Sequence, residues 1–441
     1  MAKHGVPGAA VGVFYRGHQH LRGLGVTNVD YPVHIDADTV FRIASTTKTF
    51  TGTTAMCLVD RGKLDLDSPV RRYLPDFQTS DPSVAPAVTV RQLLDHTAGW
   101  VGDDFENTGQ GAEALARYVD GMVKLPQLTP PGQVFSYNNA ALSLAGRVIE
   151  VAAGTTYEAA VKELLLDPLR LAHSRFFSDE IVGFNVAAPH VLVDGKPVVD
   201  PAAWPIERAG NPNGGLISSV RDQLRYARFH LGDGKAPNGR RVLSKKSLVA
   251  MRSRPGPGGT LIVELDGMGV SWMLRPSAQG VRIVQHGGDV PGERSGFLLV
   301  PARGFALTVL TNSDGGTKLL NELFADDWAL RRFVGITNLP ATPRNRTRRE
   351  LAAYEGRYTA TELDPKGELT VNALELRADH GQLRVDSGSG TTLSRLAFYK
   401  RDYVLKLDAD GARRGPRADF IRDSGGRIVW LRVGGRLFRH E

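Results

Sequence analysis

A serine and a lysine three residues apart open an apolar segment near the start of the chain. Ser45 and Lys48 would share one face of a helix at this spacing. A serine in the first helical turn has a free backbone N–H, which could bind an oxyanion. A neutral lysine one turn along could take the serine proton, because burial or nearby positive charge lowers a lysine pKa. The pair predicts a serine nucleophile with a lysine base, and the alternative is a helix cap followed by a solvated lysine.

A tyrosine and an asparagine two residues apart form the second candidate pattern. Tyr137 and Asn139 follow a loop that contains Pro131 and Gly132. A tyrosine hydroxyl could relay a proton to a leaving group if cations held it near the phenolate state, and an asparagine amide could bind a substrate carbonyl. The alternative is a loop tyrosine that only bonds to the backbone.

The third pattern, His286-Gly287-Gly288-Asp289, follows a β-rich segment. Two glycines at the end of a strand allow a substrate backbone to approach closely. The backbone N–H of Asp289 could complete an oxyanion hole, and His286 could act as a donor beside the tyrosine. The alternative is a turn that happens to contain a histidine.

The elements that must position these patterns divide into strands at both ends and helices between them. Residues 8–30 predict a β-hairpin, residues 45–61 a helix, and residues 66–225 mostly helices and polar loops. Short β-rich segments then follow: 267–274, 282–285, 296–301 and 306–311, with a helix over 321–333. This order predicts one sheet assembled from the two ends of a domain, with a helical segment inserted between them.

The composition changes again after this domain, which we place at residues 1–335 with its helical insertion at about 66–225. Residues 336–349 predict a linker because they hold two prolines and an arginine run. From residue 350 to 441 short alternating strands separated by turns predict a small antiparallel barrel.

The overall composition excludes several classes of protein. With 41% hydrophobic and 23% charged residues the chain is typical of a globular protein. Its single cysteine, Cys57, cannot form an internal disulfide and argues against a structural zinc site. The net charge of +8 is spread along the chain, so nucleic-acid binding is not expected.

No apolar run is long enough to span a membrane, and the first residues lack the regions of a signal peptide. The sequence as given therefore indicates a cytoplasmic protein. A secreted or periplasmic location stays open, since a leader or first helix could have been trimmed before the first strand at residue 8.

Taken together, the order Ser45-x-x-Lys48, then Tyr137-x-Asn139, then a strand with His286-Gly-Gly resembles the serine β-lactamase and penicillin-binding-protein superfamily. The Tyr-x-Asn form is similar to the class C branch and its related esterases, D-aminopeptidases and carboxypeptidases. Further local likenesses lie at residues 64–70, 93–99 and 213–219. The resemblance covers about residues 5–335 and implies an α/β (α+β) β-lactamase-like fold, in which helices flank an antiparallel sheet and an all-helical segment is inserted.

The resemblance also implies roles for the residues of the patterns. Ser45 would be the nucleophile, Lys48 its base and Tyr137 the proton relay for the leaving group and for deacylation. Asn139 would orient the substrate amide. No metal or cofactor is implied.

The third pattern departs from that of many β-lactamases. His286 takes the place of their lysine, and histidine is more usual in esterase, peptidase and thioesterase relatives, so efficient β-lactam hydrolysis is not expected. The N–H groups of Ser45 and Asp289 would form the oxyanion hole, beside Gly287 and Gly288. Because histidine titrates near neutrality, the pattern predicts a limb in the pH–rate profile between about pH 6 and 8.

The C-terminal barrel resembles the lipocalin-type domain appended to some members, among them D-amino-acid-directed peptidases and thioesterases that release and cyclise nonribosomal peptides. A structural role, or a wall beside the active site, is expected for it rather than ligand transport.

Three functions remain open. The first is hydrolysis of an amide or ester of a small-molecule or peptide substrate through an acyl-Ser45 intermediate. The second is acyl transfer by a thioesterase or cyclase, with a carrier-protein-bound thioester as substrate. The third is an inert sensor or binding protein on the same fold. The patterns do not name the substrate or the oligomeric state.

Overall fold

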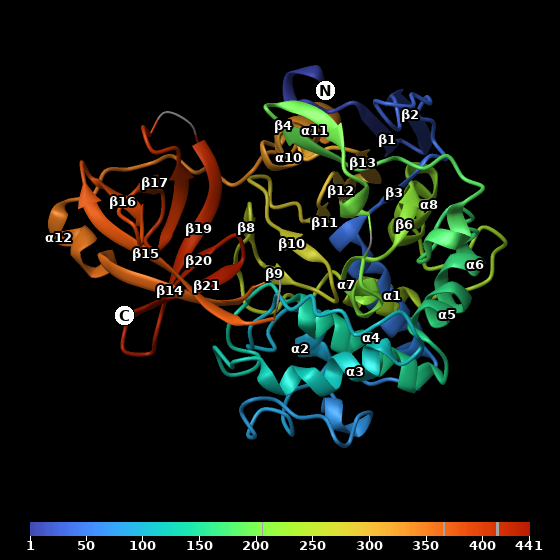
Figure 1. The fold of residues 1–441 in the computed structure, drawn as a ribbon, viewed down its shortest axis with the longest axis horizontal. Coiled ribbons are helices and arrows are strands. Elements are labelled where there is room, and N and C mark those ends of the chain that lie inside the picture. Colours follow the sequence, from blue (N-terminus) through green and yellow to red (C-terminus); the bar gives the residue numbers. More distant parts are fainter. Residues whose placement is uncertain (205, 365–366, 412–413) are drawn as a thin grey trace.

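The chain forms a larger part built of a sheet and helices, and a smaller barrel that lies beside it (Figure 1). A computed structural model describes residues 1–204, 206–364, 367–411 and 414–441. Among the described residues, no helix combines the length and the apolar character that crossing a membrane requires.

A seven-stranded antiparallel sheet forms the centre of the larger part. Its order is β2-β1-β13-β12-β11-β10-β9, so strands from both ends of this part are neighbours. The strands are β1 (Gly8–Tyr15), β2 (His18–Gly25), β9 (Gly267–Met268), β10 (Met273–Arg275), β11 (Ile283–Val290), β12 (Glu293–Val300) and β13 (Phe305–Thr311). The predicted sheet is confirmed.

Two elements differ from the sequence prediction. The strand expected over 267–274 is split into β9 and β10, because Ser271 adopts a left-handed φ of 57° between them. The helix expected over 321–333 is broken into a π-helical segment (Asn321–Ala325), which continues α10 (Gly316–Leu320), and α11 (Trp328–Val334). The break lies at Asp327, whose φ is 58° and whose carboxylate accepts from the Asn338 N–H at 2.8 Å.

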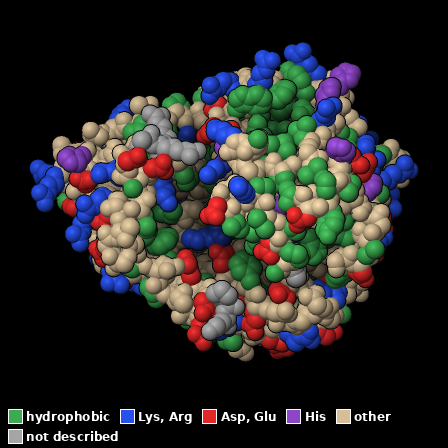
Figure 2. All heavy atoms as spheres, turned by 45° about the horizontal axis from the view of Figure 1, so that its top comes forward, with side chains coloured by type: hydrophobic (Ala, Val, Ile, Leu, Met, Phe, Trp, Pro, Cys, Tyr) green, Lys and Arg blue, Asp and Glu red, His purple; other side chains and the backbone are tan. Residues whose placement is uncertain are grey.

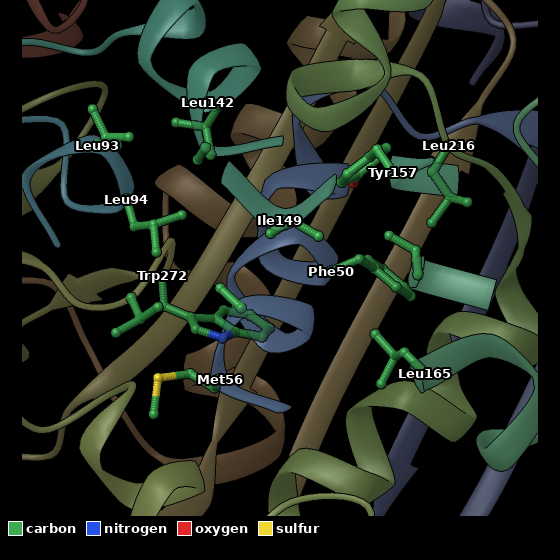
Figure 3. Packing of buried hydrophobic residues seen from close by; sticks show 14 of the residues in the cluster. Phe50, Met56, Leu93, Leu94, Leu142, Ile149, Tyr157, Leu165, Leu216 and Trp272 are labelled. Carbon is green, nitrogen blue, oxygen red and sulfur yellow. The ribbon is translucent and has the colours of Figure 1, made fainter. Parts of the chain in front are cut away.

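Helix α1 (Thr47–Asp60) runs through the middle of this part, and apolar side chains surround it (Figure 3). All of its residues from Thr47 to Leu58 are buried, whereas the sequence predicted that one wide apolar face of the helix would be buried. Its threonines tolerate burial because their hydroxyls bond locally: that of Thr53 donates to the Thr49 carbonyl at 2.8 Å and lies 2.7 Å from the Tyr226 hydroxyl.

The other helices cover α1 and the sheet. Helix α4 (Asn139–Ala153) packs on α1, and α8 (Val220–Leu231) packs on β1 and β13. The remaining helices of this part are α2 (Val90–Leu94), α3 (Ala114–Gly121), α5 (Tyr157–Val161), α6 (Asp167–Leu169), α7 (Asn211–Gly214) and α9 (Lys245–Ala250). Helix α12 (Arg348–Leu351) belongs to the barrel, whose core includes Leu351 (Figure 1). Three two-stranded sheets complete the architecture: β3 (Val40–Arg42) with β6 (Ile217–Ser219), β4 (His190–Val193) with β5 (Lys196–Val199), and β7 (Gly259–Thr260) with β8 (Glu264–Leu265).

The C-terminal part is a closed antiparallel barrel, as predicted. Its strands are β14 (Gly356–Leu363), β15 (Leu369–Asp379), β16 (Gln382–Ser387), β17 (Thr392–Phe398), β18 (Tyr403–Leu407), β19 (Arg414–Arg422), β20 (Ile428–Val433) and β21 (Arg436–His440). Pairing of β14 with β21 closes the barrel, which removes the free edges that an open sheet would expose. Its interior is filled by side chains, including Tyr358, Phe398, Phe420 and Leu431. The surface is hollowed along the boundary between the barrel and the larger part (Figure 2).

Candidate active site

Ser45 lies on a tight turn between a short strand and the central helix. The chain leaves β3, and Ala44 adopts a left-handed φ of 47°, which is uncommon for a residue with a side chain. Ser45 then sits in a 3-10 turn, Ala44–Thr46, directly before α1 rather than inside it. The Ser295 hydroxyl supports the turn because it donates to the Ile43 carbonyl at 2.7 Å. The turn leaves Ser45 partly exposed, at the wall of a cavity.

Lys48 reaches Ser45 from the first turn of the helix. Its Nζ lies 3.0 Å from Ser45 Oγ and donates to the Asn213 carbonyl at 2.6 Å. The lysine side chain is completely buried, and its pKa is held well below the usual range, first by burial and then by the Arg436 guanidinium. A neutral amine at this distance can accept the serine proton.

Tyr137 lies next to Ser45 and Lys48, in the loop before α4. Its ring stacks on His96 with centroids 4.4 Å apart, and Lys48 Nζ lies 5.0 Å from the ring centroid. Burial raises the pKa of Tyr137, although a hydrogen bond with Ser45 and the charge of Arg436 oppose the shift. Burial therefore works against the phenolate state, which was the condition set for a relay held by cations. The buried side chain is a phenol that can donate a proton.

His286 lies within β11 rather than after its end, because the strand continues to Val290. Its Nδ1 is 2.7 Å from the Gly287 carbonyl oxygen. A carbonyl only accepts, so Nδ1 carries the proton and Nε2 is the acceptor nitrogen. Burial, together with the charge of Lys48, lowers the pKa of His286 to about 3. The predicted pH limb between about 6 and 8 therefore cannot come from this histidine, which stays neutral there.

The glycines of β11 let the strand pass close to the nucleophile turn. A Cβ on Gly288 would lie 2.2 Å from the Ile43 carbonyl oxygen, so no side chain fits there. Strand β10 pairs with β11 at residues 283–285, so it does not cover the edge of β11 from His286 to Val290. The Asp289 side chain is tied to Arg294, with Oδ2 and Nε 3.0 Å apart, while its backbone N–H remains the predicted second oxyanion donor beside that of Ser45.

Asn139 lies at the start of α4 and lines the same cavity. Its Nδ2 donates to Asp103 Oδ1 at 2.6 Å, and Asp103 in turn accepts two hydrogen bonds from Arg436 of the barrel. Sequence reasoning missed Asp103 and Arg436. It also missed the Asn213 carbonyl that holds Lys48, although residues 213–219 had stood out as a local likeness.

The cavity in front of Ser45 has a volume of about 540 Å³. It is bounded by β11, β12, the segment from α10 to the π-helix, and the barrel hairpin between β20 and β21. Its apolar lining comes from Phe105, Leu261, Ile262, Val263, Met273, Phe297, Leu320, Phe324 and Ala325. The described residues hold no cluster of three or more His, Cys, Asp and Glu side chains suited to a metal ion.

Comparison with known proteins places this geometry in a family. The family model described as Beta-lactamase matches residues 1–330. Penicillin-binding protein 4 from Amycolatopsis lactamdurans is 36% identical over 350 residues, which are 78% of this chain and 91% of that protein.

Solved structures extend the likeness to the barrel. The structure of SurE matches with a TM-score of 0.78 and 27% identity over 100% of this chain and 96% of that one, and SurE with D-Leu matches with a TM-score of 0.77. A class C beta-lactamase shares the fold, with a TM-score of 0.59 and 21% identity over 74% of this chain and 92% of that one. The chain belongs to the Beta-lactamase family, the superfamily of serine β-lactamases and penicillin-binding proteins.

Proposed function

We propose that this protein is a serine acyl hydrolase that cleaves an amide or ester through an acyl-Ser45 intermediate. The observation that carries the proposal is the 3.0 Å contact between Ser45 Oγ and the buried Lys48 amine, at the wall of a cavity of about 540 Å³. An inert binding protein would have no need to bury a lysine with a depressed pKa beside a partly exposed serine.

The reaction follows from the three side chains. Lys48 takes the Ser45 proton as Oγ attacks the substrate carbonyl, and the N–H groups of Ser45 and Asp289 bind the oxyanion. When the carbon–leaving-group bond breaks, the proton held by Lys48 returns to the leaving group through the Tyr137 hydroxyl. Attack of water on the acyl-enzyme then releases the acid and restores Ser45.

The lining of the cavity supports a substrate with an apolar side chain next to the scissile carbonyl. Phe297, Leu320 and Phe324 all line this cavity, so the pocket favours an aliphatic or aromatic residue. SurE, which matches the whole chain, has been solved with D-Leu. We therefore propose acyl groups derived from apolar amino acids, with the D-configuration as the first to test.

Acyl transfer is the second candidate. The same acyl-enzyme could pass its acyl group to an amine, including the amino end of a peptide delivered as a thioester on a carrier protein. Both candidates use the same acyl-Ser45 intermediate, and they differ only in whether water or an amine attacks it.

Covalent labelling tests the proposal. Intact-mass analysis with a fluorophosphonate should show one adduct on the wild type and none on Ser45→Ala, and equal labelling of both would remove Ser45 as the nucleophile. An N-acyl-D-leucine thioester offered with and without an amine then separates the two candidates, because the mass of the product reports whether water or amine took the acyl group.

A further inference from the structure

The hairpin between β20 and β21 of the barrel docks on the segment that carries the candidate catalytic tyrosine. The Tyr137 N–H donates to the Gly435 carbonyl at 2.8 Å, and Arg432 Nη1 donates to the Phe135 carbonyl at 2.6 Å. Arg432 is buried and paired with Asp419 of the neighbouring strand β19, and Asp419 also accepts from the Thr260 hydroxyl of the larger part at 2.5 Å. The hairpin therefore has a defined position beside the cavity.

Arg436 extends from this hairpin into the wall of the cavity. Its Nε and Nη2 lie 2.8 and 2.9 Å from the two carboxylate oxygens of Asp103, a fork that fixes the plane of the carboxylate. Its guanidinium carbon also lies 4.7 Å from the centroid of the Tyr137 ring. An arginine of the barrel thus orients an acidic side chain of the larger part.

Asp103 in turn fixes the orientation of the Asn139 amide. One of its oxygens, Oδ1, accepts from Asn139 Nδ2 at 2.6 Å. Because a carboxylate has no proton to donate, the amide must turn its nitrogen toward Asp103. The amide oxygen of Asn139 is then the atom left for a ligand, and it can only accept a hydrogen bond.

We propose that Arg436 is a positioning residue for substrate binding: by holding Asp103 it fixes the Asn139 amide with its oxygen ready to accept from an N–H in the acyl part of the substrate. This inference rests on the proposed acyl-Ser45 chemistry and adds a requirement on the substrate, which must offer an N–H group to Asn139. The barrel is then part of the specificity site, and preferred substrates carry an amide N–H near the scissile carbonyl.

Two matched substrates measure this requirement. The p-nitrophenyl esters of N-acetyl-D-leucine and of 4-methylpentanoic acid share the leaving group and the isobutyl side chain, and only the first has the acetamido N–H. Arg436→Gln should lower the ratio of their kcat/KM values about tenfold, or about 1.4 kcal/mol, the worth of one well-oriented hydrogen bond. Asp103→Ala should lower the ratio as much, and the double variant no further, because both changes release the same amide.

The controls separate this inference from the function on which it rests. Arg427→Gln removes an exposed arginine that pairs with Asp423 in the neighbouring hairpin, and it should leave the ratio unchanged. Wild type that is not labelled by fluorophosphonate would refute the proposed function itself. Wild type that is labelled, with the same ratio in Arg436→Gln and Asp103→Ala, would overturn the positioning role. An equal loss on both esters would also overturn it, since that result indicates general disruption of the site.

Discussion

Replacing Lys48 with methionine should remove one contribution to the pH dependence of the free energy of unfolding. The lysine side chain is fully buried, and its pKa in the folded state is well below its usual value, mainly because of burial. In the unfolded chain the same amine titrates near about 10.4. Between these two pKa values the unfolded state binds one proton more than the folded state, so the wild type gains stability as the pH rises. Methionine has a similar length and no proton to bind.

The size of the effect follows from this one proton. The free energy of unfolding of the wild type, minus that of Lys48→Met, should rise by about 1.4 kcal/mol per pH unit, or about 2 kcal/mol between about pH 8 and 9.5. The variant also loses the hydrogen bond of 2.6 Å to the Asn213 carbonyl, but that loss is a constant offset and does not change the slope. Loss of the base should lower kcat about 10²- to 10⁴-fold.

Urea unfolding of both proteins at several pH values in this range measures the slope. All other titrating groups are shared, so they cancel in the difference. Lys63→Met, at an exposed position beyond the end of α1, is the matched control and should give a constant difference. Parallel curves for wild type and Lys48→Met would refute the reasoning, because Lys48 would then be protonated in the folded protein and could not act as a base.

Two further substitutions test the strand beside Ser45. His286→Asn should leave the shape of the pH–rate profile between about pH 5 and 8 unchanged, because the pKa of His286 is about 3; a limb near pH 6 to 7 that disappears in the variant would contradict this. Gly288→Ala would place a Cβ 2.2 Å from the Ile43 carbonyl oxygen and 2.5 Å from the Ser295 hydroxyl, so kcat/KM and Tm should both fall, with a loss of stability of about 1 to 3 kcal/mol. Gly287→Ala is its control, since the nearest atom would lie 3.3 Å away, and equal losses in the two variants would argue against the close approach at Gly288.

Patterns that lie within one element could be read from the sequence. The spacing of Ser45 and Lys48 is a property of a single helical turn, and the structure brings their polar atoms to 3.0 Å. The alternating strands of residues 8–25 and of the barrel carry their own periodicity, so the sheet and the barrel were predictable as well. The family follows from the order of three short patterns along the chain.

Contacts between distant segments could not be read in this way. Arg436 and Asp103 are 333 positions apart, and neither has neighbours that mark it as a partner of the other. The protonation states of Tyr137 and His286 depend on burial by several elements together, and a motif does not report that burial. The break at Asp327 likewise arises from a contact with Asn338, beyond the predicted helix.

The pairing of β1 with β13 has a consequence for the synthesis of this protein. Ala9 lies opposite Thr311, so β1 can pair with β13 only after about 300 further residues have been synthesised. At ribosomal speeds of about 5 to 20 residues per second, the emerging hairpin stays without this neighbour for roughly 15 to 60 s. Over that time the buried residues of β1 and its unpaired edge are open to other chains. The nascent hairpin is therefore where we expect chaperones to bind first, and where aggregation during overproduction would begin.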